Sequence, residues 1–361
     1  MTARSILASG VRAVLATLVV ACGGAGSTPT TAPDPLAGGP AEGGTLPPLL
    51  PPLGSGGPGK PIDHTAAPPY PIVLMHGMAG FDELQEGPIG ITYFNGVVDD
   101  LNAHGEHLVF TTTAPPYDTS EDRAQAVAVQ IASILARTGK AKVNLVGHSQ
   151  GGMDARVLAS PNGLAMGDVI ASITTIATPH RGSLVADAAL GLLQGVPPTV
   201  IDDVSTAFLD LLQQTVYDEQ TNPQFLGQLT ELSQSYMTST FNPKYVDDPQ
   251  VVYASYAGRT NLENGLPDCA SAAYADDPTK LDAAQPELTT TAEFLQGTSG
   301  TVNDGLVTVA SARWGTFLQC VPADHLSEVG QIEQSGPDPR SGFDHLAFFR
   351  DVVGRIRAQG F

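Results

Sequence analysis

KVNLVGHSQGG, residues 142–152, is the stretch of sequence that decides the fold. It begins as a short, mainly apolar run, which is typical of a strand buried in a parallel sheet. It then breaks into Gly147-x-Ser149-x-Gly151, the spacing of a strand-to-helix turn so tight that only very small residues fit beside its serine. Because such a turn holds the serine hydroxyl clear of the backbone at a helix N-terminus, the sequence predicts that Ser149 is a nucleophile.

The segments on either side of this turn predict an α/β fold. YPIVLMHGMAG, residues 70–80, contains a second apolar run that breaks at glycine. Between the two runs, Glu121 to Arg137 carries apolar residues at helical spacing before Gly139, and Met153 to Ala159 predicts a further helix. Strand, helix and strand in this order form the unit of a parallel sheet. We therefore expect a mostly parallel central sheet flanked by helices.

Composition and charge limit the classes of protein to which this chain can belong. The chain has 361 residues, of which 42% are hydrophobic, and this suffices for one large domain with a substantial core. Its formal net charge of −20 excludes binding to nucleic acid through a basic patch.

The segment before residue 70 predicts export. Residues 1–22 carry two arginines and an apolar stretch that is too short to span a bilayer, as in a signal peptide. Its end, VVAC, resembles a bacterial lipobox, in which Cys22 is lipidated; the alternative is an ordinary cleaved signal with an incidental cysteine. Residues 23–69 are rich in Gly, Pro, Thr and Ala and predict a flexible linker. We expect a protein that is secreted, or anchored to a membrane through Cys22, with its catalytic domain at 70–361.

A serine in such a turn needs an acid, a histidine and an oxyanion hole. The expected chain order is serine, acid, histidine, which leaves His180, His325 and His345 downstream. His180 follows an apolar run too closely for a base, and spacing does not choose between His325 and His345. Asp304, in NDGLV, precedes an apolar run and is one candidate acid among many.

The oxyanion donors are expected from two backbone positions. One is Gln150, directly after the serine, and the other is Met78, in the loop after the first apolar run. In this interpretation the backbone N–H groups matter and the side chains do not. His76, which precedes the serine in the chain, is expected to be structural.

Taken together, these motifs resemble the true lipases of Pseudomonas and Burkholderia, bacterial lipase family I. The matching stretches are YPIVLMHGMAG (70–80), KVNLVGHSQGG (142–152), ASITTIATPHRGS (171–183), NDGLV (303–307) and HLSEVGQ (325–331). The resemblance implies an α/β-hydrolase fold with a helical cap. It places the nucleophile at Ser149, the acid at Asp304, the base at His325 and the oxyanion hole at Met78 and Gln150. His345 then becomes a helix residue near the C-terminus.

The cysteines predict one disulfide. If Cys22 carries lipid, Cys269 and Cys320 remain, and an exported protein is expected to pair them; the alternative is two separate buried thiols. The resemblance implies the same bridge, although Cys320 lies further beyond Asp304 than the corresponding family cysteine does.

The resemblance also implies a structural calcium ion near the catalytic histidine, and here the chain departs from the family. The family has an Asp ligand two residues after that histidine, where this chain has Ser327, and a hydroxyl is a much poorer calcium ligand than a carboxylate. Gln331, a ligand through its backbone, is present, and Asp277 or Asp282 aligns with the upstream acidic ligand. No cofactor is expected for the chemistry. Many members also need a periplasmic foldase as a partner.

Residues 184–245 are expected to form the cap and lid. An amphipathic lid covers the site in water and exposes its apolar face at a lipid–water interface; the alternative is a set of helices packed permanently on the core. Three apolar groups have helical spacing: Leu190, Leu192 and Leu193; Val204, Phe208, Leu211 and Leu212; and Phe225, Leu226, Leu229 and Leu232.

The function implied is that of a triacylglycerol lipase that acts on acylglycerols through an acyl-enzyme. The alternatives are a carboxylesterase, a polyester or polyhydroxyalkanoate depolymerase, an acyltransferase and a catalytically silent lipid-binding protein. The presence of a serine, an acid and a histidine in the expected order argues against the last.

Overall fold

The structure, a computed structural model, describes residues 65–80, 83–86, 89–213, 223–260, 284–299, 302–331, 337–338 and 341–361. These residues belong to one unit, Lys60–Phe361. The predicted signal peptide, the lipidation site at Cys22 and most of the predicted linker lie outside the described residues. Among the helices that are described, none is long and apolar enough to cross a membrane.

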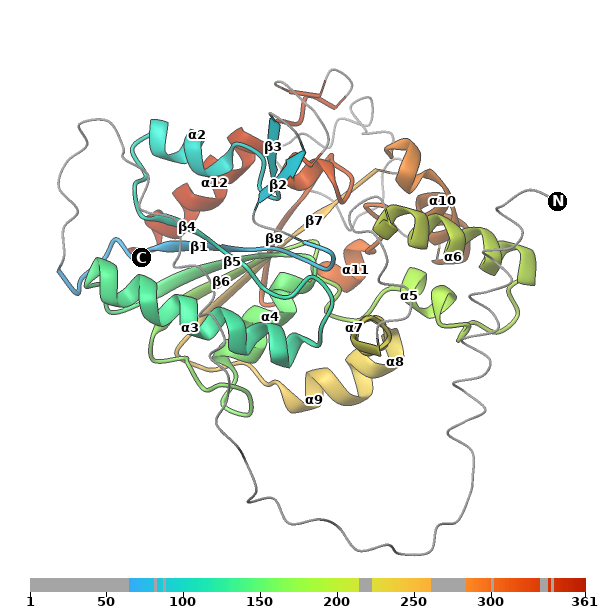
Figure 1. The fold of residues 1–361 in the computed structure, drawn as a ribbon, viewed down its shortest axis with the longest axis horizontal. Helices are drawn as coiled ribbons and strands as arrows, with labels where there is room; N and C mark the ends of the chain where they lie inside the picture. The colour runs from blue at the N-terminus through green and yellow to red at the C-terminus, as the bar shows by residue number, and fades with distance from the viewer. Residues whose placement is uncertain are drawn as a thin grey trace, which may run out of the picture. The chain divides into compact units, whose positions relative to one another are not determined.

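A six-stranded, wholly parallel sheet forms the centre of the domain (Figure 1). Its strands are β1 (Ile72–Met75), β4 (Val109–Thr112), β5 (Val143–His148), β6 (Ile170–Ile176), β7 (Val252–Gly258) and β8 (Thr316–Val321), in the spatial order β4-β1-β5-β6-β7-β8. The two apolar runs that predict strands are β1 and β5, and they are neighbours, with Met75 opposite Gly147. The predicted parallel sheet is confirmed.

Helices cover both faces of this sheet (Figure 1). One face carries α2 (Val97–Ala103) and α12 (His345–Ala358), and the other carries α3 (Ser120–Thr138) and α4 (Gln150–Ala159). Thr119 caps α3 by accepting the Asp122 N–H on its side chain, and the helix ends at Gly139, whose φ of 69° is in the left-handed region. The helix predicted from Glu121 to Arg137 is therefore confirmed, with its end at the predicted glycine.

An extensive apolar cluster of buried residues lies between the sheet and the helices α2 and α12. Alternate residues of β1, Ile72 and Leu74, contribute to it together with Phe348 and Phe349 of α12. Burial of each such side chain stabilises the fold by roughly 1.5–3 kcal/mol. This packing holds β1 and its neighbours together, so the strand ends that carry the two glycine-rich turns are fixed beside each other.

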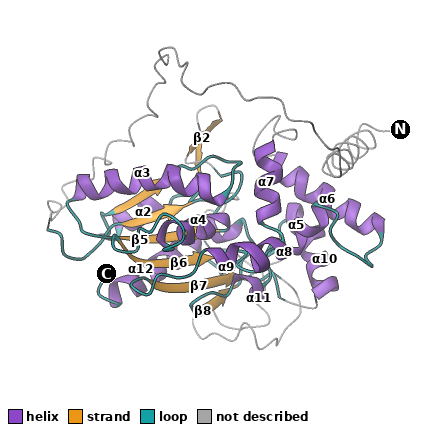
Figure 2. Cartoon of the chain, turned by 90° about the horizontal axis from the view of Figure 1, so that it is seen from below, coloured by secondary structure: helices purple, strands orange, loops and turns teal. Residues whose placement is uncertain are grey.

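Further helices lie beyond one end of the sheet. In Figure 2, α5, α6, α7 and α10 gather on one side of the strands. These and the smaller elements are α5 (Leu184–Ala189), α6 (Pro198–Gln213), α7 (Pro223–Glu231), α8 (Gln234–Tyr236), η1 (Met237–Phe241), α9 (Asn242–Lys244), η3 (Pro286–Leu288), α10 (Thr289–Ser299), α11 (Val309–Ala312), η4 (Ser327–Val329) and the antiparallel pair β2 (Glu83–Glu86) and β3 (Ile89–Thr92).

Two of the three apolar groups predicted for the cap lie on helices as expected. Val204, Phe208 and Leu212 are buried on α6, and the third group falls on α7 and just after it. The first group is not helical, because α5 ends at Ala189 and Gly191 turns the chain with a φ of 67°. Leu192 is consequently 52% exposed. Movement of these helices as a lid stays a prediction.

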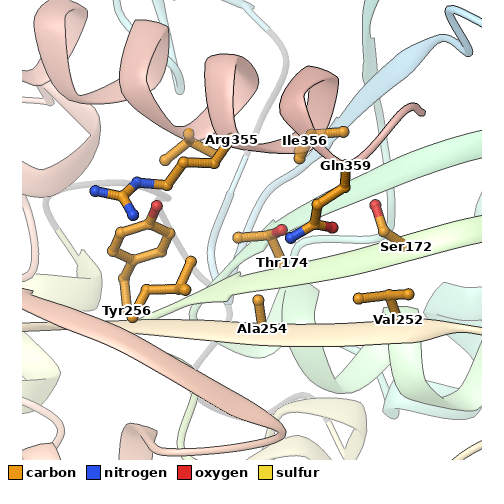
Figure 3. A pocket seen from close by; sticks show the side chains of 10 residues that line it. Ser172, Thr174, Val252, Ala254, Tyr256, Arg355, Ile356 and Gln359 are labelled. Atoms are coloured by element: carbon orange, nitrogen blue, oxygen red, sulfur yellow. The ribbon is translucent and has the colours of Figure 1, made fainter.

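A small pocket opens between α12 and the sheet (Figure 3). Ser172 and Thr174 of β6, Val252 of β7 and Arg355 of α12 are among the residues that line it. Val252 is the first residue of its strand, so the pocket extends toward the amino ends of the strands. Ligand sites of parallel sheets lie at the carboxyl ends. This pocket is therefore separate from the predicted site.

Candidate active site

Ser149 occupies the turn between β5 and α4 in a strained conformation. Its φ of 54° and ψ of −128° are unfavourable for any residue with a side chain. The glycines beside it are required by space, because a Cβ on Gly151 would lie 2.3 Å from the Met75 carbonyl oxygen, and one on Gly147 would lie 2.5 Å from the Gly152 nitrogen. The predicted tight turn is confirmed, and it brings the start of α4 into contact with the end of β1.

The backbone of Ser149 is held from the neighbouring strand. Its N–H donates to the Ile176 carbonyl at 2.9 Å, and its own carbonyl accepts from Thr178 Oγ1 at 2.7 Å. Both partners belong to the end of β6 and the loop after it. These bonds stabilise the strained turn and fix the direction of the serine side chain.

Two backbone N–H groups beside the serine have no acceptor among the residues that the structure describes. A Cβ on Gly77 would lie 2.7 Å from Ser149 Cβ and 3.2 Å from its Oγ, so the loop after β1 passes directly against the serine. Met78 follows in this loop, and Gln150 begins α4. Within the described residues, neither backbone N–H donates a hydrogen bond. Both are available to an anion at this position.

The structure brings His325 and Asp304 together. His325 Nδ1 lies 2.8 Å from Asp304 Oδ2, and both side chains are buried. The other carboxylate oxygen of Asp304 accepts the N–H groups of Leu306 and Val307 at 2.8 and 2.7 Å. The loop NDGLV therefore orients its own acid, a common use of Asp in turns. The ring of His325 lies 4.6 Å from that of His148, the residue before Ser149.

The two other downstream histidines make different contacts. His345 is the first residue of α12, as expected of a helix residue near the C-terminus, and its Nε2 lies 2.7 Å from the Asn95 carbonyl. His180 is fully buried, with its Nε2 3.0 Å from Thr175 Oγ1, and its ring stacks on Trp314. Burial lowers the pKa of His180 well below its ordinary value. Within the described residues, neither His345 nor His180 is hydrogen-bonded to a carboxylate as His325 is to Asp304.

Sequence patterns missed a buried network behind the serine and the histidine. The Tyr93 hydroxyl lies 2.7 Å from His148 Nδ1, and His148 Nε2 lies 3.1 Å from Glu328 Oε2. Burial lowers the pKa of His148 well below its ordinary value and raises that of Glu328 well above it, the latter with the help of nearby carboxylates. Burial thus disfavours the charged forms of both side chains in this contact. His148 and Glu328 lie inside recognised motifs, but no local pattern marked Tyr93.

Arg123 was also missed, and it holds the loop after β1. Its guanidinium is fully buried and donates to the carbonyls of His76 at 2.7 Å and Gly77 at 3.2 Å, and to that of Pro115. Its Nε donates to Asp154 Oδ2 of α4 at 2.8 Å. Burial raises the pKa of Asp154 to about 7 even beside this guanidinium. Arg123 thus joins the loop that carries Met78 to the helix that follows the serine.

His76 has the structural role expected of it. Its Nε2 accepts the Ala114 N–H at 3.0 Å, and its Nδ1 lies 2.9 Å from the Gly77 carbonyl. Burial, with the nearby charge of Arg123, lowers the pKa of His76 to about 3. The ring is therefore neutral and fixed in one tautomer, and it serves to shape the loop.

Helix α7 is bonded directly to the turn that carries the serine. Gln228 Nε2 donates to Gln150 Oε1 at 2.5 Å, and Glu231 accepts the Ser120 N–H at 2.7 Å. The Gln150 amide in turn donates to Ser120 Oγ at 3.3 Å. The side chain of Gln150 is thus used to connect α3, α4 and α7, and its backbone N–H remains available.

One group in the described part of the chain has metal-ligand residue types close together. It consists of His148, His325 and Glu328, whose ligand atoms lie within 4.8 Å of one another. Two of its three ligands are imidazoles, whereas calcium prefers oxygen. This group is therefore not a calcium site.

The predicted disulfide and the predicted calcium ligands fall partly outside the residues that the structure describes. Cys269, Asp277 and Asp282 are outside, so neither the disulfide nor the upstream calcium ligand is described. Cys320 is buried on β8. Gln331 donates its N–H to the Leu326 carbonyl at 3.1 Å.

Comparison with known proteins identifies the family. The family model for the alpha/beta hydrolase fold matches residues 70–283, which is more than half of the chain. The chain belongs to the α/β-hydrolase family. A triacylglycerol lipase of Vibrio cholerae is 31% identical over 306 residues, which cover 81% of this chain and 88% of the relative. A triacylglycerol lipase of Pseudarthrobacter phenanthrenivorans is 28% identical over 335 residues, with coverage of 82% and 99%.

A solved structure agrees with this α/β-hydrolase assignment. The mature form of the Bacillus licheniformis lipase BlEst2 superposes with a TM-score of 0.52 at 21% sequence identity, covering 76% of this chain and 91% of that one. At this identity the likeness supports the fold alone. The predicted fold class and the resemblance to bacterial lipases are confirmed.

Proposed function

We propose that this chain hydrolyses the carboxylic esters of acylglycerols, as a lipase, through an acyl-enzyme on Ser149. The hydrogen bond of 2.8 Å between His325 and Asp304, next to the strained serine turn, carries the proposal. The relatives named triacylglycerol lipase support it, since they match most of the chain at 28–31% identity. The helices α5 to α10 beyond the strand ends favour acylglycerols over a polyester chain, which needs an open groove.

The geometry supports a two-step acyl transfer. His325 accepts the proton of Ser149 as the serine oxygen attacks the ester carbonyl, and Asp304 orients His325 and stabilises its charged form. The N–H groups of Met78 and Gln150 stabilise the oxyanion, and loss of one such donor typically costs roughly a hundredfold or more in rate. Water, activated by the same histidine, then hydrolyses the acyl-enzyme.

The test is turnover by the wild type and by Ser149→Ala. We expect the wild type to hydrolyse p-nitrophenyl esters from acetate to palmitate and emulsified triolein, and the variant to lose this activity with an unchanged circular dichroism spectrum. Activity confined to short esters would indicate a carboxylesterase or a polyester hydrolase. Full activity in Ser149→Ala would refute the assignment.

Export, a membrane anchor at Cys22 and the bridge between Cys269 and Cys320 stay predictions from the sequence, as does a foldase partner. They do not enter the chemistry proposed for the site.

A further inference from the structure

A buried carboxylate closes the loop that carries His325. Asp324, directly before the histidine, is fully buried. Its Oδ1 accepts the N–H groups of Leu326 at 3.1 Å and Ser327 at 2.7 Å, and its Oδ2 accepts the N–H of Gln285 at 2.8 Å. Three backbone donors thus converge on one side chain next to the proposed base.

The bond to Gln285 joins segments that are far apart in the chain. Gln285 directly precedes η3, and a Cβ on Gly305 would lie 3.0 Å from Leu288 of η3, so this helix packs against the loop of the proposed acid. Asp324 therefore ties the histidine loop to the same element that supports the Asp304 loop. The position of His325 relative to Asp304 depends on both contacts.

This arrangement does not fit the calcium ion that the lipase resemblance implies beside the histidine. Calcium takes six to eight oxygen ligands, with carboxylates foremost. Position 327 offers only a hydroxyl, and both oxygens of Asp324 already accept backbone N–H groups. Within the described residues of this loop, the one other acidic side chain is Glu328, whose Oε2 contacts His148. Its buried Oε1 and the Ser327 hydroxyl have no hydrogen-bond partner there, but two such oxygens fall far short of the six to eight that calcium takes.

We propose that Asp324 is a positioning residue that fixes the histidine loop by hydrogen bonds in place of a metal ion, so that catalysis does not require calcium. This rests on the proposed ester hydrolysis at Ser149. Asp324 does not touch substrate; it acts through His325. Its loss moves His325 relative to Ser149 and so lowers kcat, whereas substrate binding is unchanged.

The first measurement uses the wild-type protein after dialysis against EGTA, with and without added calcium chloride. Thermal unfolding and the hydrolysis of p-nitrophenyl butyrate are followed in both conditions. We expect the same Tm and the same kcat in each. Loss of activity or of Tm in EGTA that calcium restores would overturn the proposal. If the wild type hydrolyses no ester, the proposed function fails, and the Tm comparison still decides whether calcium binds.

The second measurement compares variants of the hydrogen-bonded pair. Asp324→Asn replaces one acceptor oxygen by an NH₂ group. Gln285→Pro removes the backbone N–H donor together with the glutamine side chain, at a residue whose φ of −56° already suits proline, and Gln285→Ala, which keeps the N–H, shows the effect of the side chain alone. We expect Asp324→Asn and Gln285→Pro each to lower kcat roughly ten- to a hundredfold at unchanged KM, with no rescue by calcium, since small misplacements of catalytic groups have effects of this size.

The matched control is Asp344→Asn. Asp344 caps α12 by accepting the N–H groups of Leu346 and Ala347, and Asn caps as well as Asp, so kcat should stay at the wild-type value. Wild-type kcat in Gln285→Pro and in Asp324→Asn, or recovery of either with calcium, would refute the role of Asp324. If Asp324→Asn fails to fold, Gln285→Pro alone decides.

Discussion

Replacement of Arg123 by leucine tests whether a buried guanidinium both stabilises the fold and positions the oxyanion loop. The substitution leaves Asp154 buried without its cation and removes the donor to the His76 and Gly77 carbonyls. Breaking one side of a buried ion pair costs about 3–5 kcal/mol. The pKa of Asp154 is already raised to about 7, so the acid can take up a proton, which limits the cost to about 3 kcal/mol. In a domain that spans residues 70–361, with an unfolding entropy of about 2.1 cal/mol/K per residue, that lowers Tm by roughly 5 °C.

The double variant Arg123→Leu with Asp154→Leu separates the two roles. Removal of the unpaired acid recovers part of the lost Tm, because a buried ion pair replaced on both sides by apolar groups is often near neutral. The carbonyls of His76 and Gly77 still lack their donor, so the loop that carries Met78 stays displaced. We therefore expect kcat to remain roughly ten- to a hundredfold below the wild-type value.

The assay follows thermal unfolding by circular dichroism, and hydrolysis of p-nitrophenyl butyrate well below the lowest Tm. Asp351→Asn is the control, since Asp351 pairs with Arg355 one helical turn away at the surface, a contact worth about 0.3–0.5 kcal/mol. An unchanged Tm in Arg123→Leu would refute the assigned energy. Recovery of kcat together with Tm in the double variant would refute the positioning role.

Two further predictions concern buried groups next to the serine. His76 is neutral in the folded state with a pKa of about 3, against 6.5 when unfolded, so the stability that it contributes above pH 6.5 is lost as the pH falls toward 3. At pH 5 the loss in the free energy of unfolding is about 2 kcal/mol. His76→Gln keeps an acceptor for the Ala114 N–H, so we expect urea unfolding of this variant to lose about that much less stability between pH 7 and pH 5 than the wild type does. The same pH dependence in both proteins would contradict the assignment. Tyr93→Phe leaves His148 Nδ1 without its hydroxyl partner. We expect this to lower the free energy of unfolding by about 1–3 kcal/mol, measured by thermal unfolding, and to lower kcat by a larger factor than it raises KM. Equal Tm values for the variant and the wild type would exclude this role.

The parts of the fold that the sequence predicted correctly have local causes. The turn at Ser149 requires small neighbours, and α3 carries its own cap at Thr119 and its own stop at Gly139, so short windows suffice to identify them. The group Leu190, Leu192 and Leu193 was predicted as helical because its spacing fits a helix, but Gly191 ends that pattern with a left-handed φ.

The parts that were missed depend on partners distant in the chain. Arg123 would be expected at a solvated helix surface, and nothing nearby in the sequence indicates that Asp154, 31 residues later, binds it. Spacing likewise did not choose between His325 and His345. That choice came from the resemblance, and the structure then placed His325 against Asp304 because the NDGLV loop orients the acid.

The side-chain hydrogen bond between Gln228 and Gln150 limits which cap helices can be exchanged with those of a related hydrolase. Sequence position assigns α7 to the cap, but the bonds from Gln228 and Glu231 make it part of the frame that holds the serine turn. A chimera that imports a foreign α7 would bring side chains unmatched to Gln150 and Ser120. The portion of the cap that can be exchanged without removing these bonds therefore ends before Pro223, and changes of substrate range are to be sought before α7.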